Sequence, residues 1–157
     1  MTLLKPRYRY ENLKRVLVDG KRLYSCPNGE SLPSVTTILD STKDKSHLIE
    51  WRRKVGEEQA NIITREASGI GTRMHKYLEE YIERGSWGTP GSNPFAQQAH
   101  QMAQTVGKNA LIHVDEIWGS EVSLYYPQIY AGTTDCVGTY KGAPCIIDFK
   151  QSNKPKK

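Results

Sequence analysis

The sequence lacks the features that mark membrane-spanning and secreted proteins. No apolar run approaches the roughly 20 residues that a membrane helix needs, and the mean hydropathy is -0.64. The first ten residues have no apolar stretch, so they do not predict a secretory signal, although an organelle presequence remains an alternative reading of them. We therefore expect an intracellular, cytoplasmic protein with no membrane partner.

Cysteine is scarce, and the sequence has no internal repeat or low-complexity tract. The three cysteines, Cys26, Cys136 and Cys145, form no CxxC pair, and their odd number predicts reduced thiols rather than a disulfide framework. With 157 residues, 37% hydrophobic and 25% charged, the composition is that of one globular domain large enough to bury a core.

Positive charge exceeds negative charge, with a formal net charge of +5 at pH 7. Basic residues alternate with tyrosines near the start and gather again at the end of the chain, a pattern that favours phosphates and stacked bases as partners. A solvated basic face followed by a polar tail is the alternative. The candidate DNA contacts are Arg7, Arg9, Arg73 and Lys154.

The order of the expected elements indicates the fold class. Asp19-Gly20 predicts the tight turn of a small N-terminal hairpin, and Ser34 is a candidate helix N-cap. Periodic apolar residues then predict helices, with Gly69 and Gly71 ending the first of them, and three strands follow. The expected ranges are 13–18 and 21–24 for the hairpin, 44–68, 72–84 and 95–112 for helices, and 117–126, 130–140 and 144–150 for strands.

These elements predict an α/β domain in which helices precede a β-meander and cover its sheet. Residues 1–31 form a basic strand and hairpin segment, and residues 32–157 form the core. The candidate core positions of the helices are Leu48, Trp51, Val55, Ile62, Ile63, Met74, Tyr77, Leu78, Tyr81 and Ile82.

The strongest chemical signal is the segment Ile146-Ile147-Asp148-Phe149-Lys150. Asp148 and Lys150 are two residues apart, so in a strand both face one side while Phe149 faces the other. A carboxylate can bind Mg²⁺ or another hard cation, and a lysine can orient water or stabilise charge on a phosphate. An ordinary salt bridge at a sheet edge is the alternative.

The preceding strand supplies further acidic residues. Asp135 lies thirteen residues before Asp148 (148 − 135 = 13), so a hairpin around Lys141 to Pro144 brings the two carboxylates nearly opposite each other. Such carboxylates repel unless a cation lies between them, which favours a metal, although one protonated carboxyl is an alternative. Glu121, one strand earlier, could add a ligand or hold a metal-bound water, or it could simply face solvent.

The expected second helix carries a histidine with an acidic neighbour. His75 and Glu79 are four residues apart and share a helix face. A neutral imidazole can bind a metal while a nearby carboxylate fixes its tautomer, whereas the alternative is a surface His–Glu pair.

Taken together, these motifs resemble the PD-(D/E)XK nuclease superfamily and its RecB-like exonuclease branch, which includes mitochondrial genome maintenance exonucleases and phage-encoded relatives. The resemblance covers most of the chain from residue 32 onward and rests on three stretches in family order. These stretches are Leu32 to Leu39 with Leu48 to Trp51, Gly71 to His75 with Glu79, and Tyr130 to Asp135 with Ile146 to Lys150.

The resemblance implies roles for individual residues. His75, Asp135, Asp148 and the carbonyl of Phe149 match the family's metal ligands, and Lys150 matches its catalytic lysine. Glu121 matches an acidic position at the site entrance. The implied activity is Mg²⁺- or Mn²⁺-dependent hydrolysis of DNA phosphodiester bonds, often at single-stranded ends, in a cell that could be a phage-infected host.

One departure from the family pattern concerns its C-terminal part. Family members continue past the D-x-K strand into a further strand and a helix with a Q-x-x-x-Y motif, whereas this sequence ends seven residues after Lys150 (157 − 150 = 7). Gln151 also stands where the family more often has threonine. The explanations are a truncated chain, a split enzyme whose second polypeptide supplies the C-terminal half, or an inactive nucleic-acid-binding remnant. We favour the split exonuclease, with a homing-type endonuclease as a further alternative.

Overall fold

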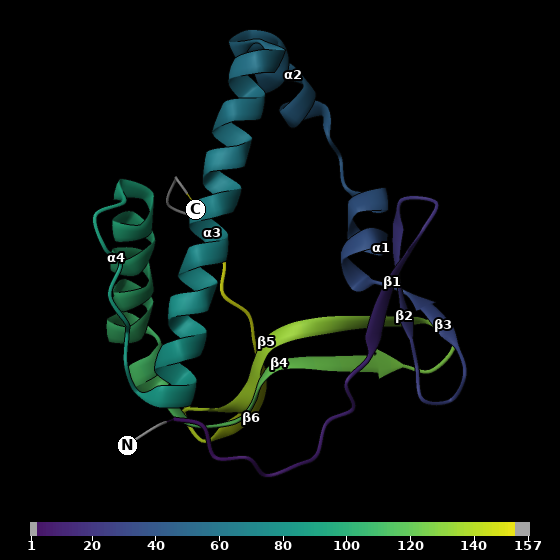
Figure 1. The fold of residues 1–157 in the computed structure, drawn as a ribbon. Coiled ribbons are helices and arrows are strands. Elements are labelled where there is room, and N and C mark those ends of the chain that lie inside the picture. Colours follow the sequence, from purple (N-terminus) through teal and green to yellow (C-terminus); the bar gives the residue numbers. More distant parts are fainter. Residues whose placement is uncertain (1–2, 153–157) are drawn as a thin grey trace.

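The computed structural model describes residues 3–152, which contain two antiparallel sheets of three strands each and four α-helices (Figure 1). The α/β class and the predicted order, a hairpin followed by helices and then a β-meander, are confirmed. The bounds are β1 Lys14–Val18, β2 Lys21–Ser25, β3 Ser31–Pro33, α1 Val35–Thr42, α2 Ser46–Val55, α3 Glu57–Arg84, α4 Pro94–Asn109, a 3-10 turn Leu111–His113, β4 Val114–Tyr126, β5 Tyr130–Tyr140 and β6 Ala143–Ile147. As far as the described residues extend, none of the helices is long and apolar enough to cross a membrane.

The N-terminal sheet has the strand order β1-β2-β3 and begins with the predicted hairpin. Asp19 and Gly20 both have positive φ, 51° and 74°, which the two central residues of such a turn require. A small core of Leu13, Tyr24, Cys26, Leu32 and Ala131 joins this sheet to β5.

Helix α1 begins at the predicted N-cap. The Ser34 hydroxyl accepts a hydrogen bond from the Thr37 backbone N–H at 3.0 Å, which satisfies one of the free donors at the helix start. Val35, Thr36 and Thr37 are poor helix formers because they are β-branched, yet they follow this cap as helix.

The break between the first long helices lies at Gly56, and the prediction that Gly69 and Gly71 end a helix is wrong. Gly56 has φ 89°, a backbone conformation that residues with a side chain rarely adopt. Its N–H donates a hydrogen bond to the carbonyl of Arg52. Helix α3 then runs without interruption for 28 residues. A glycine inside a helix costs only about 1 kcal/mol, so packing along the rest of α3 outweighs it.

Several apolar positions predicted for the core are exposed instead. Leu48, Val55 and Ile62 are 51%, 37% and 41% exposed, so their assignment to the core is wrong. In Figure 1, α2 and the N-terminal half of α3 extend away from the second sheet, which these helices were expected to cover. Hydrophobic periodicity gives the apolar face of a helix but does not say whether another element lies against that face.

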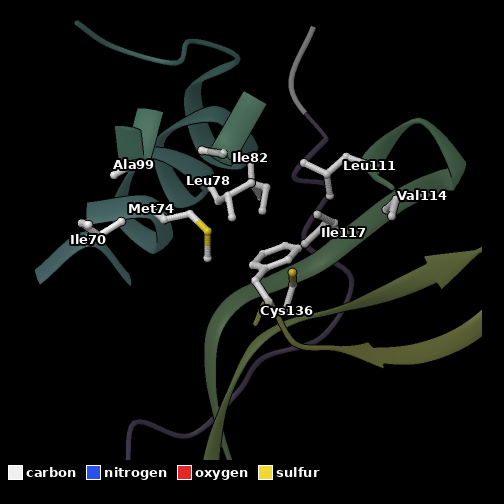
Figure 2. Close-up of a cluster of buried hydrophobic side chains, with 11 residues drawn as sticks. Ile70, Met74, Leu78, Ile82, Ala99, Leu111, Val114, Ile117 and Cys136 are labelled. Atoms are coloured by element: carbon white, nitrogen blue, oxygen red, sulfur yellow. The ribbon is translucent and has the colours of Figure 1, made fainter. Parts of the chain in front are cut away.

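The main core lies between the C-terminal half of α3, α4 and the second sheet (Figure 2). Met74, Leu78 and Ile82 are buried as predicted, and Tyr77 and Tyr81 pack beside them. Helix α4, capped by the Asn93 side chain and starting with Pro94, packs its small residues along α3. The remaining members of this core are Ile70, Ala99, Ala103, Leu111, Val114, Ile117, Cys136 and Phe149.

The second sheet has the order β4-β5-β6, and β5 is its central strand. The last pair of the antiparallel β5–β6 ladder is Cys136 with Ile147. Asp135, one residue before Cys136, and Asp148, one residue after Ile147, therefore lie next to each other just beyond the end of the ladder. The predicted strand to Lys150 is too long, because β6 ends at Ile147 and the D-x-K residues continue beyond the ladder. Residues 3–5 run along the outer edge of β4. There the Lys5 N–H donates a hydrogen bond to the carbonyl of Ile117, and the Ile117 N–H donates one to the carbonyl of Leu3.

Candidate active site

His75 lies at the centre of the polar contacts between α3 and the second sheet. Its Nδ1 is 2.8 Å from the carbonyl oxygen of Gly71, and its Nε2 is 2.9 Å from that of Phe149. Carbonyl oxygens only accept hydrogen bonds, so both ring nitrogens must donate, which describes the imidazolium form. The hydrogen bond to Asp135 raises the pKa of His75 to about 9 against the opposing effect of burial, and the Gly71 carbonyl adds to the rise.

Asp135 of β5 accepts hydrogen bonds from two directions. Its Oδ2 is 2.6 Å from the Phe149 N–H and 3.4 Å from His75 Nε2. Burial raises the pKa of Asp135, but hydrogen bonds from His75 and the Phe149 N–H outweigh burial and leave the pKa below its usual range. The ionised carboxylate thus links α3 to the segment that follows β6.

Asp148 and Lys150 form an ion pair on the more exposed side of the site. Asp148 Oδ2 is 2.8 Å from Lys150 Nζ, with side chains 45% and 71% exposed. The hydrogen bond to Asp148 raises the pKa of Lys150, so the ammonium group stays charged. Phe149 between them is buried in the main core, as the predicted alternation requires.

Two glutamates lie on the other side of His75, where they line a narrow recess with His75 and Asp135. Partial burial of the Glu121 carboxyl group raises the pKa of Glu121, and the negative charge of Asp135 is the next largest cause of the rise. Burial and the charge of Glu83 raise the pKa of Glu79. Glu121 also has φ 51° inside β4, a left-handed conformation that is uncommon for residues other than glycine.

The predicted DNA contacts are dispersed over the molecule. The Arg7 guanidinium lies 5.2 Å from the ring of Trp118 and 5.6 Å from that of Tyr8, as in a cation–π contact. Arg9 and Arg73 are exposed, the latter on α3 two residues before His75. Lys154 lies outside the described residues.

The donor atoms fit a metal ion in kind, but only some of them converge. Mg²⁺ takes ligands at about 2.1 Å in octahedral geometry, which places neighbouring ligand atoms about 3 Å apart. The spacings of His75 Nε2 to the Phe149 carbonyl and to Asp135 are close to this value. Within residues 3–152, however, no three His, Cys, Asp or Glu side chains lie close enough to hold a metal, and Asp148 pairs with Lys150.

Two features of the site escaped the sequence analysis. Gly71 supplies the carbonyl that orients His75, and a Cβ there would lie 2.7 Å from the Gln151 side chain, so the absence of a side chain leaves room for that residue. A groove of about 550 Å³ opens beside Asp148 and Lys150, lined by tyrosines of β4 and β5. The tyrosines flanking the turn at residues 127–129 were the sequence signal for this groove.

Comparison with known proteins gives a partial match. No protein-family model matches the sequence. Mitochondrial genome maintenance exonuclease 1 of Mus musculus is 29% identical over 136 residues, and those of Xenopus tropicalis and Homo sapiens are each 27% identical over 139 residues. Each match covers 80% of this chain and 38% of the relative, so the chain spans less than two fifths of the length of these proteins. The chain is therefore distantly similar to exonucleases over most of its own length.

Proposed function

We propose that the chain carries the metal-dependent centre of a deoxyribonuclease of the PD-(D/E)XK type, acting as an exonuclease or as its catalytic part. The observation that carries the proposal is the meeting of His75, Asp135 and the Asp148–Lys150 pair, which come from α3, β5 and the segment after β6. Their order along the chain follows the motif pattern, and the similarity to named exonucleases supports the exonuclease reading over a sequence-specific endonuclease.

In this proposal His75, Asp135, Asp148 and the Phe149 carbonyl hold Mg²⁺ or Mn²⁺. When bound, the metal supplies an activated water and stabilises negative charge on the phosphate. His75 must give up its Nε2 proton to act as a ligand, because a metal needs the nitrogen lone pair. Asp135 is already ionised, and its bond from the Phe149 N–H fixes the direction of the carboxylate.

Lys150 provides the positive charge next to the scissile phosphate. Its side chain is 71% exposed, so the ammonium group can reach a substrate while Asp148 holds it in place. Glu121 and Glu79, with their raised pKa values, stand where they can accept a proton or hold a water beside His75 and Asp135.

A second candidate function is nucleic-acid binding without turnover. It is favoured by the ion pair of Asp148 with Lys150, because the lysine ammonium then occupies a carboxylate oxygen that the proposed metal would need, and among residues 3–152 no three His, Cys, Asp or Glu side chains lie close enough to hold a metal. A catalytically inactive chain would keep salt-sensitive DNA binding but would not depend on a divalent metal.

A partner polypeptide is also part of the proposal. Among the described residues β6 pairs only with β5, so its outer edge presents free backbone groups, and Ile146 on β6 is 65% exposed. An open sheet edge with exposed apolar side chains is a site where another chain can add a strand.

The test is degradation of end-labelled single-stranded DNA by the purified chain in Mn²⁺. We expect the wild type to shorten the labelled strand progressively. Lys150→Ala should lower the rate of degradation by roughly a hundredfold or more. Lys108→Ala, an exposed lysine of α4, is the matched control and should cut like the wild type. Circular dichroism establishes that each variant is folded.

Other outcomes separate the alternatives. Salt-sensitive DNA binding that is indifferent to Mn²⁺, with no degradation and no effect of Lys150→Ala, would favour the binding module. Degradation that appears only after a second polypeptide is added would favour the split enzyme. Undiminished cutting by Lys150→Ala would contradict the proposed centre.

A further inference from the structure

Strand β1 forms an open edge of the N-terminal sheet. Within residues 3–152 it pairs only with β2, so the backbone groups of every second residue point away from the sheet. In Figure 1 the turn end of the β1–β2 hairpin stands clear of the second sheet. An open edge of this kind is a template on which another chain can add a strand.

Aliphatic side chains are exposed along this edge. Leu17 is 76% exposed, more than any other large hydrophobic residue among those described, and its neighbour Val18 is 47% exposed. Val16 is half-buried. Branched aliphatic side chains pack well against the side chains of a neighbouring strand, whereas stacking of bases needs aromatic rings. The exposed surface therefore fits a polypeptide better than a nucleic acid.

Basic residues surround these apolar side chains. Lys14 and Arg15 precede them on β1, and Lys21 and Arg22 lie opposite them on β2. All four side chains are exposed, and in the described part of the chain none of them forms an ion pair. The hairpin has one acidic residue, Asp19 in its turn. The edge thus combines free backbone groups, apolar side chains and an excess of positive charge.

This excess of charge distinguishes between two possible occupants of the edge. A second copy of β1 would bring the cations of two hairpins together, and like charges on neighbouring strands repel each other. A strand that carries carboxylates would be attracted instead. The charge of Arg15 already acts on Glu121 of the candidate active site, so Lys14, Lys21 and Arg22 are the cations that an acidic strand would meet.

A small core beneath the hairpin holds the edge in a fixed position. Tyr24 of β2 is 2% exposed, and its hydroxyl oxygen is 3.1 Å from that of Thr133 on β5. Leu13, directly before β1, is buried in the same core. An edge that is already ordered loses little conformational freedom when a strand adds to it, which favours binding.

A pocket of about 410 Å³ lies between this hairpin and α1. Leu17, Lys21 and Arg22 line it from the hairpin, and hydroxyl-bearing residues of α1 line it from the other side. Asp40 contributes a carboxylate, which is paired with Lys45 at 3.0 Å. Side chains that an added strand directs to this face would enter the pocket beside Leu17.

We propose that β1 binds an acidic polypeptide segment in an extended conformation, which adds a fourth strand to the N-terminal sheet. The backbone of the segment pairs with the outer edge of β1. Its apolar side chains contact Leu17 and Val18, and its carboxylates pair with Lys14 and Lys21. This edge belongs to a different sheet from the edge of β6, and the inference does not depend on the proposed nuclease function.

The probe is a heptapeptide with two glutamates at each end and valine, isoleucine and valine between them, which suits either strand direction. One control peptide has methyl groups on the three central amide nitrogens, so it keeps its charge and side chains but cannot donate those backbone hydrogen bonds. A second control has lysine in place of each glutamate. Each peptide is titrated into the full ¹⁵N-labelled chain in EDTA, and amide chemical shifts are followed by NMR.

We expect the acidic peptide to shift the amide signals of residues 14–18 and to bind with a millimolar or lower Kd. Both control peptides should bind roughly fivefold or more weakly, which corresponds to the loss of about one hydrogen bond or ion pair. Leu17→Ser and Lys14→Glu should each weaken binding of the acidic peptide. The matched controls are Ile112→Ser, which replaces a residue that is 68% exposed, and Lys108→Glu on α4; both should bind like the wild type.

Several outcomes would overturn the inference. Equal binding of the methylated peptide would mean that charge alone attracts it and that no strand is added. Shifts along residues 143–147 instead of 14–18 would assign the peptide to the edge of β6. If an oligothymidylate shifts the amides of β1 and the acidic peptide does not, the hairpin is a nucleic-acid surface. Binding of the acidic peptide at β1 supports the inference whether or not the chain degrades DNA.

Discussion

At the scale of single residues, environment rather than identity sets the chemistry of the three cysteines. Burial raises the pKa of Cys136 to about 12, and the charge of Asp135 adds to the rise. Burial, with a smaller effect of Glu30, also raises the pKa of Cys26. Cys145 on β6 is only half-buried. All three thiols are free, as the odd cysteine count predicted.

We therefore expect one fast-reacting thiol in the native protein. A thiolate is the reactive form, so at pH 8 the buried Cys26 and Cys136 should react slowly with Ellman's reagent while Cys145 reacts quickly. Spectrophotometric titration should give one rapidly reacting thiol per chain in buffer and three in denaturant. Cys145→Ser should remove the fast phase and Cys26→Ser should keep it; a fast phase of two or more equivalents would contradict the prediction.

The site residues show which side-chain contacts can be predicted from residue spacing alone. The spacing of Asp135 and Asp148 around a short turn predicts that the two lie opposite each other, and the ladder brings them there. The ion pair of Asp148 with Lys150 is the salt bridge that the spacing offered as an alternative, but the spacing does not decide between that pair and a metal site, because a side-chain torsion directs Asp148 to the lysine or to the neighbouring carboxylate. Their roles as metal ligands stay predictions.

At the scale of elements, glycine illustrates why local signals mislead. Gly56, Gly69 and Gly71 look alike in the sequence, but only Gly56 has a positive φ and separates two helices. The other two lie within α3, where helix hydrogen bonds and packing against the core override the weak propensity of glycine. The difference comes from the tertiary structure, which local propensity does not describe.

Two helical glycines should respond oppositely to the same substitution. Gly69→Ala in α3 adds a methyl whose nearest neighbour is an Arg73 nitrogen at 3.5 Å, so we expect about 0.5–1 kcal/mol of stabilisation from helix propensity. In α4, Gly107→Ala would overlap the ring of Trp87, which is stacked on Tyr81, and should destabilise by about 1–3 kcal/mol. Urea unfolding measures both; changes of the same sign would refute the packing argument.

At the scale of the whole molecule, the first described residues form hydrogen bonds with a helix and a strand that lie far from them in the sequence. Leu4 donates its N–H to the carbonyl of Ile82 at the end of α3, and Lys5 donates to Ile117 of β4. Leu3 and Leu4 also pack against the main core. The first residues, which read as a basic segment in the sequence, therefore contribute backbone pairing to the sheet edge.

We expect Leu4→Ala to lower the free energy of unfolding by about 1–2 kcal/mol, since a half-buried leucine loses part of the contacts of a core residue. Arg9→Ala removes an exposed side chain a few residues away and should change stability by less than about 0.5 kcal/mol. Chemical denaturation measures the difference. Equal stability of both variants would mean that residues 3–5 are a passive tail.

The sequence by itself determined the α/β class, the hairpin turn at Asp19-Gly20, the cap at Ser34 and the buried stripe of Met74, Leu78 and Ile82, because each depends on local conformation or periodicity. Only the tertiary structure decided which apolar faces find a partner, that His75 meets Asp135, and that tyrosines of β4 and β5 line a groove ending at Lys150. These outcomes depend on how elements pack against one another, which periodicity along one element does not specify.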